Sequence, residues 1–175
     1  MTRPGADIPV LETERLRLRA PRLSDFERWA EFFASERSVH ERGMRPRAEA
    51  WRTWTSDVAL WTLRGYGPFG VEDRATGAYL GEVGIYHPDH YPEPELGWFV
   101  VPEAEGKGFA AEAARAVMDW TRKDLGWTRL INIIEPANDR SIALGLRLGG
   151  RIDSEARGED PGDVVIVHDL AVVPA

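Results

Sequence analysis

The stretch ELGWFVVPEAEGKGFAAEAARAVMDW, from Glu95 to Trp120, decides the fold predicted for this chain. Its first seven residues are mostly aromatic or aliphatic and a proline follows them, so a strand is expected to end at Val101. Gly106 and Gly108 then form a loop whose backbone can approach a ligand closely. An Ala-rich helix is expected to begin near Phe109, because its apolar side chains recur at spacings of three and four.

The loop before this helix is a candidate anion site. Free backbone amides and the positive end of the helix dipole, about half a charge, suit a pyrophosphate there. An ordinary strand-turn-helix corner fits the two glycines as well, and the residues leave both interpretations open. A GxGxxG motif needs glycine at position 111, which is Ala111, and the pattern GxxxxGK[ST] has no match. Dinucleotide folds and P-loop folds are therefore disfavoured.

The loop resembles the acyl-CoA-binding signature of the GNAT superfamily of N-acetyltransferases, [QR]-x-x-G-x-[GA], which ends on residues matched by Gly106, Lys107 and Gly108. Glu103 stands where the signature has Gln or Arg. The resemblance implies that backbone amides of this loop hold the phosphates of acetyl-CoA. The binding residues that it implies are Phe99, Val100, Val101, Glu103, Gly106, Lys107, Gly108, Phe109, Ala110, Ala111, Asn138 and Ser141.

Composition limits the class of protein. The 175 residues are expected to form one domain at 10–175 after a disordered lead-in at 1–9. Without cysteine, the chain has no disulfide, thiolate nucleophile or Cys-based zinc site. It shows no apolar run of about 18 residues and no signal peptide, so a cytoplasmic location away from membranes is expected. The net charge of −7 argues against nucleic acid and suits a cationic amine, although it also fits a merely soluble surface.

The remaining segments complete one sheet and its helices. Alternating leucines and arginines predict a half-buried strand at 11–20, with the arginines facing solvent. Ser24 and Glu27 form a capping box for a first helix. A second helix at 48–63 carries a tryptophan stripe that is either core or the wall of a substrate cleft. Further strands are expected at 66–72, 78–86, 127–134, 151–156 and 164–172, and a short helix at 141–148.

This order of elements predicts an α/β fold, called α+β in some schemes, with one mixed sheet and helices on both faces. It is also the GNAT order, which implies a mostly antiparallel sheet of about seven strands with a splayed central parallel pair. Two segments resemble the RimJ/RimL-like branch. They are TERLRLR from Thr13 to Arg19, and PANDRSIALGLRLG from Pro136 to Gly149.

Acetyl transfer to an amine requires a group that takes a proton from the ammonium form. Glu82 and Glu95 are acidic residues in otherwise apolar strands, placed either at a solvated sheet edge or in a cleft. Glu95 is the first choice because it lies on the central strand. It precedes Val100 by five residues, roughly 17 Å along a straight strand, so a water or a bent strand would be needed. His87 and Glu93 are weaker candidates for this base, and His40, in a polar loop, is either solvated or in contact with substrate.

The resemblance also implies how the acetyl group is held. The oxyanion would meet a backbone N–H near Val100 that a bulge frees, and the pantetheine arm would lie between this strand and the one at 127–134. Asn138 matches a family residue that contacts this arm, and it fits a helix cap equally well. The tyrosine that protonates the thiolate in many members is replaced by Gly145, whereas Ser141 matches the serine of the RimL-like branch.

Direct transfer of acetyl from acetyl-CoA to a primary amine in a ternary complex is therefore expected. A non-catalytic acyl-CoA-binding or protein-interaction module is the alternative, suggested by the missing tyrosine and by Glu103. G-x-S-x-G and H-E-x-x-H are absent, and no metal is predicted. The amine, a small molecule or a protein N-terminus, and the choice between monomer and homodimer stay open.

Overall fold

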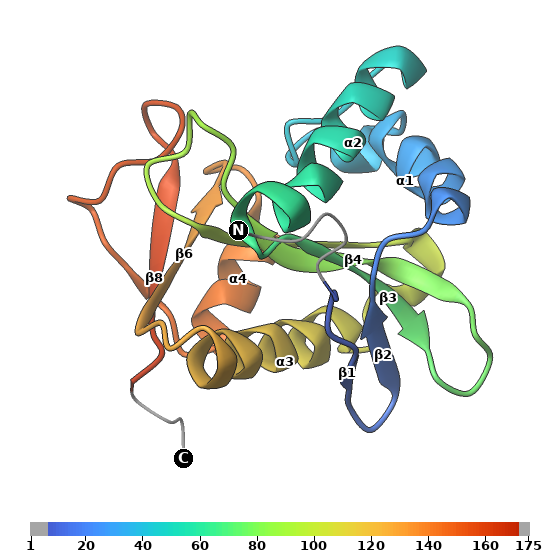
Figure 1. The fold of residues 1–175 in the computed structure, drawn as a ribbon. Coiled ribbons are helices and arrows are strands. Elements are labelled where there is room, and N and C mark those ends of the chain that lie inside the picture. Colours follow the sequence, from blue (N-terminus) through green and yellow to red (C-terminus); the bar gives the residue numbers. More distant parts are fainter. Residues whose placement is uncertain (1–6, 172–175) are drawn as a thin grey trace.

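A computed structural model describes residues 7–171 of the chain (Figure 1). Within this range one eight-stranded sheet has the order β1-β2-β3-β4-β5-β6-β8-β7. The strands are β1 (Leu11–Glu12), β2 (Leu16–Arg19), β3 (Pro68–Asp73), β4 (Tyr79–Tyr86), β5 (Glu95–Val100), β6 (Arg129–Ile134), β7 (Arg151–Ile152) and β8 (Val164–Asp169). The helices are α1 (Phe26–Phe33), α2 (Arg47–Arg64), α3 (Phe109–Asp124) and α4 (Asp139–Arg147).

Helices cover both faces of the sheet, α1 and α2 on one side and α3 and α4 on the other (Figure 1). The predicted mixed sheet with helices on both faces is confirmed. It has eight strands rather than about seven, because the N-terminal strand is divided in two. No helix within residues 7–171 combines the length and the hydrophobicity needed to cross a membrane.

The sheet opens between β5 and β6, which form its parallel pair. Six residue pairs join β4 to β5, whereas β5 and β6 meet only at Glu95 and Ile131. Two side chains hold the strands together at this point. The Asn132 amide donates to the Leu96 carbonyl at 2.6 Å, and the Glu95 carboxylate accepts from the Ile133 N–H at 3.0 Å. The predicted splayed pair is confirmed, and the gap begins beyond Leu96.

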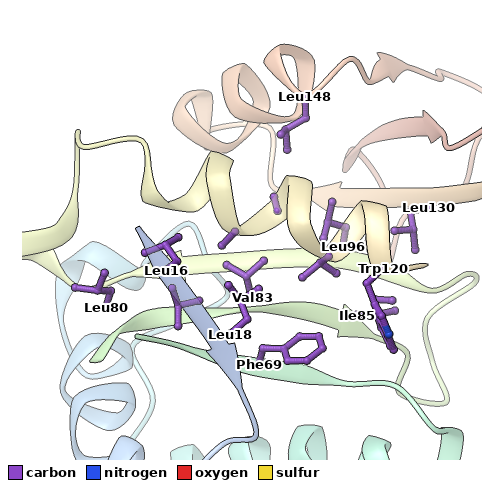
Figure 2. Packing of buried hydrophobic residues seen from close by; sticks show 14 of the residues in the cluster. Leu16, Leu18, Phe69, Leu80, Val83, Ile85, Leu96, Trp120, Leu130 and Leu148 are labelled. Carbon is purple, nitrogen blue, oxygen red and sulfur yellow. The ribbon is translucent and has the colours of Figure 1, made fainter. Parts of the chain in front are cut away.

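The main core fills the space between the sheet and α3 (Figure 2). Val83 and Ile85 of β4 and Leu96 of β5 are at most 1% exposed, since alternate residues of neighbouring strands share a face. Ala113 and Ala114 of α3 are fully buried. Their small side chains allow the helix to lie close to the sheet, which is the packing that the Ala-rich sequence predicts.

A second core on the opposite face is aromatic. It joins Trp29 and Phe32 of α1 and Trp54 of α2 to Phe99 of β5, and the Phe32 and Phe99 rings stack with centroids 4.7 Å apart. Trp51, on the same predicted stripe, remains 43% exposed. This cluster fixes α1 and α2 over the strand that borders the gap.

The N-terminal segment differs from the prediction. The chain turns between β1 and β2, so that Leu11 pairs with Leu18. Arg19 was expected to face solvent, but it is 5% exposed, because its guanidinium binds Asp25 at 2.6 Å and Glu72 at 3.0 Å. Ile8 packs against the main core, so ordered packing begins within the expected lead-in, whose residues 1–6 lie outside the described range.

The capping box expected at Ser24 and Glu27 is wrong. A 3₁₀ turn, Leu23–Asp25, precedes α1, and the Asp25 carboxylate accepts the Arg22 N–H at 2.8 Å. At the other end, the predicted strand at 151–156 contains only the two residues of β7, and residues 172–175 lie outside the described range.

Candidate active site

Two cavities meet beside β5. The first, of about 690 Å³, is called the groove and runs between β5, the start of α3 and the start of α4. The second, of about 480 Å³, is called the side cavity and lies between β4, β5, α1, α2 and the loop at 87–94. Glu41, Trp98 and Phe99 line both. The two cavities therefore adjoin at these three residues.

The start of α3 presents free amides to the groove. Gly106 and Gly108 have φ values of +70° and +78°, which L side chains rarely adopt, so glycine is required for this turn. The first backbone bond of the helix runs from Glu112 N–H to the Gly108 carbonyl, at 3.1 Å. The amides at 109–111 thus lack intrahelical partners. Arg15 fixes the turn by donating to the Lys107 carbonyl at 3.0 Å.

The splay also frees amides of β5. Val101 N–H donates to the Leu80 carbonyl at 2.9 Å, and the direction of donation alternates along an antiparallel pair. The amides of Trp98 and Val100 therefore point away from β4, into the gap toward β6. The bulge expected near Val100 is wrong, because the β4–β5 register runs unshifted and the shift in this region lies between β3 and β4.

Most of the predicted cofactor-binding residues border the groove. Those that line it are Phe99, Val100, Gly106, Gly108, Phe109, Ala110, Ala111, Asn138 and Ser141. Val101, Glu103 and Lys107 are not among the lining residues. The Val101 side chain is in the core, and Glu103 forms an ion pair with Arg28 outside the groove. Arg37 and Arg140 border the groove and flank Glu105, which is 3.1 Å from the Arg140 guanidinium.

Asn138 and Ser141 stand at the start of α4. The Asn138 side chain accepts the Ser141 N–H at 3.2 Å, so the predicted cap is confirmed. The Ser141 hydroxyl accepts from the Trp98 indole N–H at 3.3 Å. Gly145 faces the sheet, where an added Cβ would lie 2.7 Å from Ile166. The space that a tyrosine side chain at position 145 would need is therefore occupied.

The two carboxylates proposed as bases line the side cavity, so they lie in a cleft and not at a solvated edge. Glu82 is 1% exposed and accepts from the Tyr86 hydroxyl at 2.8 Å. Burial raises the pKa of Glu82 to about 8, and nearby Asp57 adds to the rise. Burial likewise raises the pKa of Glu95 to about 8, although the Ile133 N–H opposes it.

Two further acidic residues border the site, Asp57 and Glu41. Asp57 of α2 lines the side cavity, and burial raises its pKa to about 7. Its spacing was a usable signal, because it lies three residues after Trp54 and four before Trp61, within the apolar stripe. Glu41 belongs to a polar loop without periodicity, and no sequence pattern marked it.

The lesser candidates are engaged elsewhere. His87 pairs with the Tyr66 hydroxyl at 2.9 Å, and Glu93 binds Arg129 at 2.7 Å. His40 borders the groove and lies 3.1 Å from Glu135. The arrangement as a whole suits a polyanionic ligand with an extended arm in the groove. The side cavity, with the buried carboxylate of Glu82, the partly buried ones of Asp57 and Glu95, and aromatic walls, suits an organic cation.

The chain matches the family model described as an Acetyltransferase (GNAT) domain over residues 15–151. An acetyltransferase crystal structure from Agrobacterium tumefaciens str. C58 is 38% identical, with a TM-score of 0.89 over 92% of this chain and 94% of that one. The uncharacterized N-acetyltransferase YoaA of Bacillus subtilis is 27% identical over 81% of this chain and 82% of its own length. The match to a further relative from that organism, the uncharacterized protein YkkB, is 29% identical and spans 59% of that protein.

A more distant structure shares the fold. The ribosomal L7/L12 alpha-N-protein acetyltransferase RimL, solved in complex with coenzyme A, is 15% identical and has a TM-score of 0.71 over 92% of this chain and 98% of that one.

Proposed function

Because this chain belongs to the GNAT acetyltransferase family and is an N-acetyltransferase, we propose that it transfers acetyl directly from acetyl-CoA to a primary amine in a ternary complex. The observation that carries this proposal is the meeting of the groove and the side cavity at Glu41, Trp98 and Phe99. Two substrates bound in these cavities would face one another without an intermediate carrier. The chain also lacks cysteine, the usual nucleophile for an acyl-enzyme formed from a thioester.

The groove has the groups that acetyl-CoA, which supplies acetyl as a thioester, requires. Free amides at 109–111 and the dipole of α3 suit its pyrophosphate, and Arg37 and Arg140 are cations within reach of phosphate. The Trp98 and Val100 amides suit a pantetheine arm that pairs with β5. One of these two amides would also stabilise the oxyanion. Asn138 and Ser141 close the opposite wall.

The side cavity is proposed to hold the amine. Tyr86, Trp98 and Phe99 provide aromatic walls. Among residues 7–171, neither the buried Glu82 carboxylate nor the partly buried Glu95 carboxylate has an ion-pair partner. An ammonium group that enters beside them lowers their pKa, because an opposite charge favours the ionised form. The carboxylate then accepts a proton from the amine. We rank Glu95 first as this base and Glu82 second, with Ser141 as the donor to the departing thiolate.

The acceptor class is a small amine or a protein N-terminus. The segments Thr13 to Arg19 and Pro136 to Gly149 support a place near the RimJ/RimL-like branch. RimL is named for acetylation of a protein N-terminus, and its structure shares this fold. The acidic, partly enclosed cavity favours acceptors whose amine carries a positive charge in solution.

The test is turnover with acetyl-CoA and a panel of amines that includes N-terminal peptides, polyamines, amino acids and aminoglycosides. Free thiol is measured against time, and the amine product is identified by mass spectrometry. We expect amine-dependent thiol release with one acetyl group on an amino nitrogen. Tight acetyl-CoA binding without turnover of any amine would favour the non-catalytic alternative.

A further inference from the structure

Three residues line both cavities, Glu41, Trp98 and Phe99, and Glu41 is the titratable one. It belongs to the loop between α1 and α2. The next residue, Arg42, has a φ of +53° and binds Glu159, Asp160 and Asp163 at 2.6 to 2.8 Å. This triple ion pair fixes the loop, so the Glu41 side chain has a defined place at the junction.

The Glu41 carboxylate contacts the groups that border the thioester end of the groove. Its Oε1 accepts from the Asn138 amide at 2.9 Å and from the Ser141 hydroxyl at 3.4 Å. The Trp98 indole can only donate, and it donates to the Ser141 oxygen at 3.3 Å. The Ser141 proton is therefore directed toward Glu41. When Glu41 is protonated, the same contact can run in the opposite direction.

Several charged groups act on Glu41 from the elements around it. Burial raises its pKa, and the amide of Asn138 and the hydroxyl of Ser141 oppose the rise. His40 on its own loop and Arg140 on α4 also favour the charged form, whereas Glu95 of β5 repels it. Because burial raises the pKa of Glu41 above its ordinary value, this carboxylate holds a proton more readily than an exposed one and can accept and return it.

The chemistry of the proposed reaction leaves a role for such a group. The ammonium nitrogen of the acceptor loses two protons in becoming an amide nitrogen, and only one proton ends on the sulfur of coenzyme A. A base such as Glu95 removes the first proton to solvent. The second must pass from the nitrogen, in the side cavity, to the sulfur, in the groove. Glu41 lines both cavities and contacts Ser141, the proposed donor.

We propose that Glu41 is a proton-relay residue that carries this second proton to Ser141, an inference that rests on the proposed function. After the C–N bond forms, the Glu41 carboxylate accepts the proton from the positively charged nitrogen of the tetrahedral intermediate. As the C–S bond breaks, the Ser141 hydroxyl gives its proton to the sulfur and receives one from Glu41. The carboxylate is restored, and no other reactant is needed.

The test is a double-mutant cycle with Glu41→Gln, Ser141→Ala and the combined variant. Glutamine still accepts from the Asn138 amide but carries no transferable carboxyl proton. We expect Glu41→Gln to lower kcat by about 10² or more, in the usual range for proton transfer, with the KM for acetyl-CoA changed less than about threefold. The double variant should be no slower than the slower single variant, because residues that act as a unit are not additive. Glu36→Gln, an exposed carboxylate near the same loop, is the matched control and should keep the wild-type rate.

Further measurements separate a relay from a structural role. The pH dependence of kcat should change shape in Glu41→Gln, where only the acidic limb set by the base Glu95 remains, and should stay unchanged in Glu36→Gln. Calorimetric binding of acetyl-CoA confirms folding of each variant, and Glu41→Ala, which also lacks a carboxyl group, replaces Glu41→Gln in the cycle if the latter does not fold. A wild-type kcat in Glu41→Gln, or losses that multiply in the double variant, would overturn the relay while the acetyltransferase activity stands. Failure of the wild-type protein to acetylate any amine would instead refute the proposed function.

Discussion

Replacing Gly108 by Asp tests whether the amides before α3 hold a phosphate. Gly108 has a φ of +78° and precedes the first free amides of the helix. An added Cβ there would meet only the Arg15 guanidinium, at 3.6 Å, so the fold has room for a side chain. Asp and Asn adopt positive φ more readily than other L residues, and they are nearly equal in size. Comparing Gly108→Asp with Gly108→Asn therefore isolates the effect of charge.

The expected size of the effect follows from Coulomb's law. A carboxylate about 5 Å from one phosphate charge costs about 1 kcal/mol in water and about 3 kcal/mol at an effective dielectric constant of 20. Each 1.4 kcal/mol is a tenfold change in affinity. Gly108→Asp should thus bind coenzyme A roughly 5 to 150 times more weakly than Gly108→Asn, and the difference should shrink as salt is added.

Calorimetric titration of coenzyme A into both variants, at low and at physiological salt, measures this difference. Thermal unfolding confirms that each variant is folded. Equal affinities for Gly108→Asp, Gly108→Asn and the wild-type protein would show that no phosphate sits near this turn, and the groove would lose its proposed ligand.

Three other perturbations address neighbouring parts of the site. Lys107→Ala should weaken coenzyme A binding by about 1 kcal/mol or less, since the lysine does not line the groove and salt screens its charge. A loss of affinity above about a hundredfold in calorimetry would contradict this. Glu95→Gln should lower kcat by about 10² to 10⁴ and retain acetyl-CoA affinity, and higher pH should partly restore its rate. If Glu82→Gln has a low kcat and Glu95→Gln a wild-type kcat, then Glu82 is the base. Folded Glu82 keeps its proton up to a pKa of about 8, whereas the unfolded chain loses it near 4.5, so the free energy of unfolding should fall as pH rises. The fall should be about 1.4 kcal/mol from pH 7 to 9 by denaturant titration, and Glu82→Gln should lack that part of it.

The elements that local chemistry determines were predictable from the sequence. The central strand, the turn at Gly106 and Gly108 and the start of α3 depend on β propensity, positive φ and helical periodicity, all within about 15 residues. The cap at Asn138 is similarly local. These features were sufficient to place the groove, because a loop between a strand and a helix is fixed at both ends.

Features that depend on distant partners were not predictable in this way. The alternating pattern predicts that Arg19 faces solvent. In the structure the β2–β3 pairing places Glu72, 53 positions away, beside it, and the two side chains are hydrogen-bonded. Glu41 gains its place from Asn138 and Ser141, 97 and 100 positions away, and its loop carries no periodic signal. The role expected of a bulge is taken by the splay between β5 and β6, which depends on the side chains of Glu95 and Asn132.

Direct transfer requires that acetyl-CoA and the amine are bound together, in the groove and the side cavity. Initial rates measured while acetyl-CoA and an accepted amine are varied together test it most directly. Double-reciprocal plots that intersect are predicted, since both substrates must be present before acetyl moves. Parallel lines, with acetylated protein detected by mass spectrometry when acetyl-CoA is added alone, would show an acyl-enzyme intermediate and contradict the account.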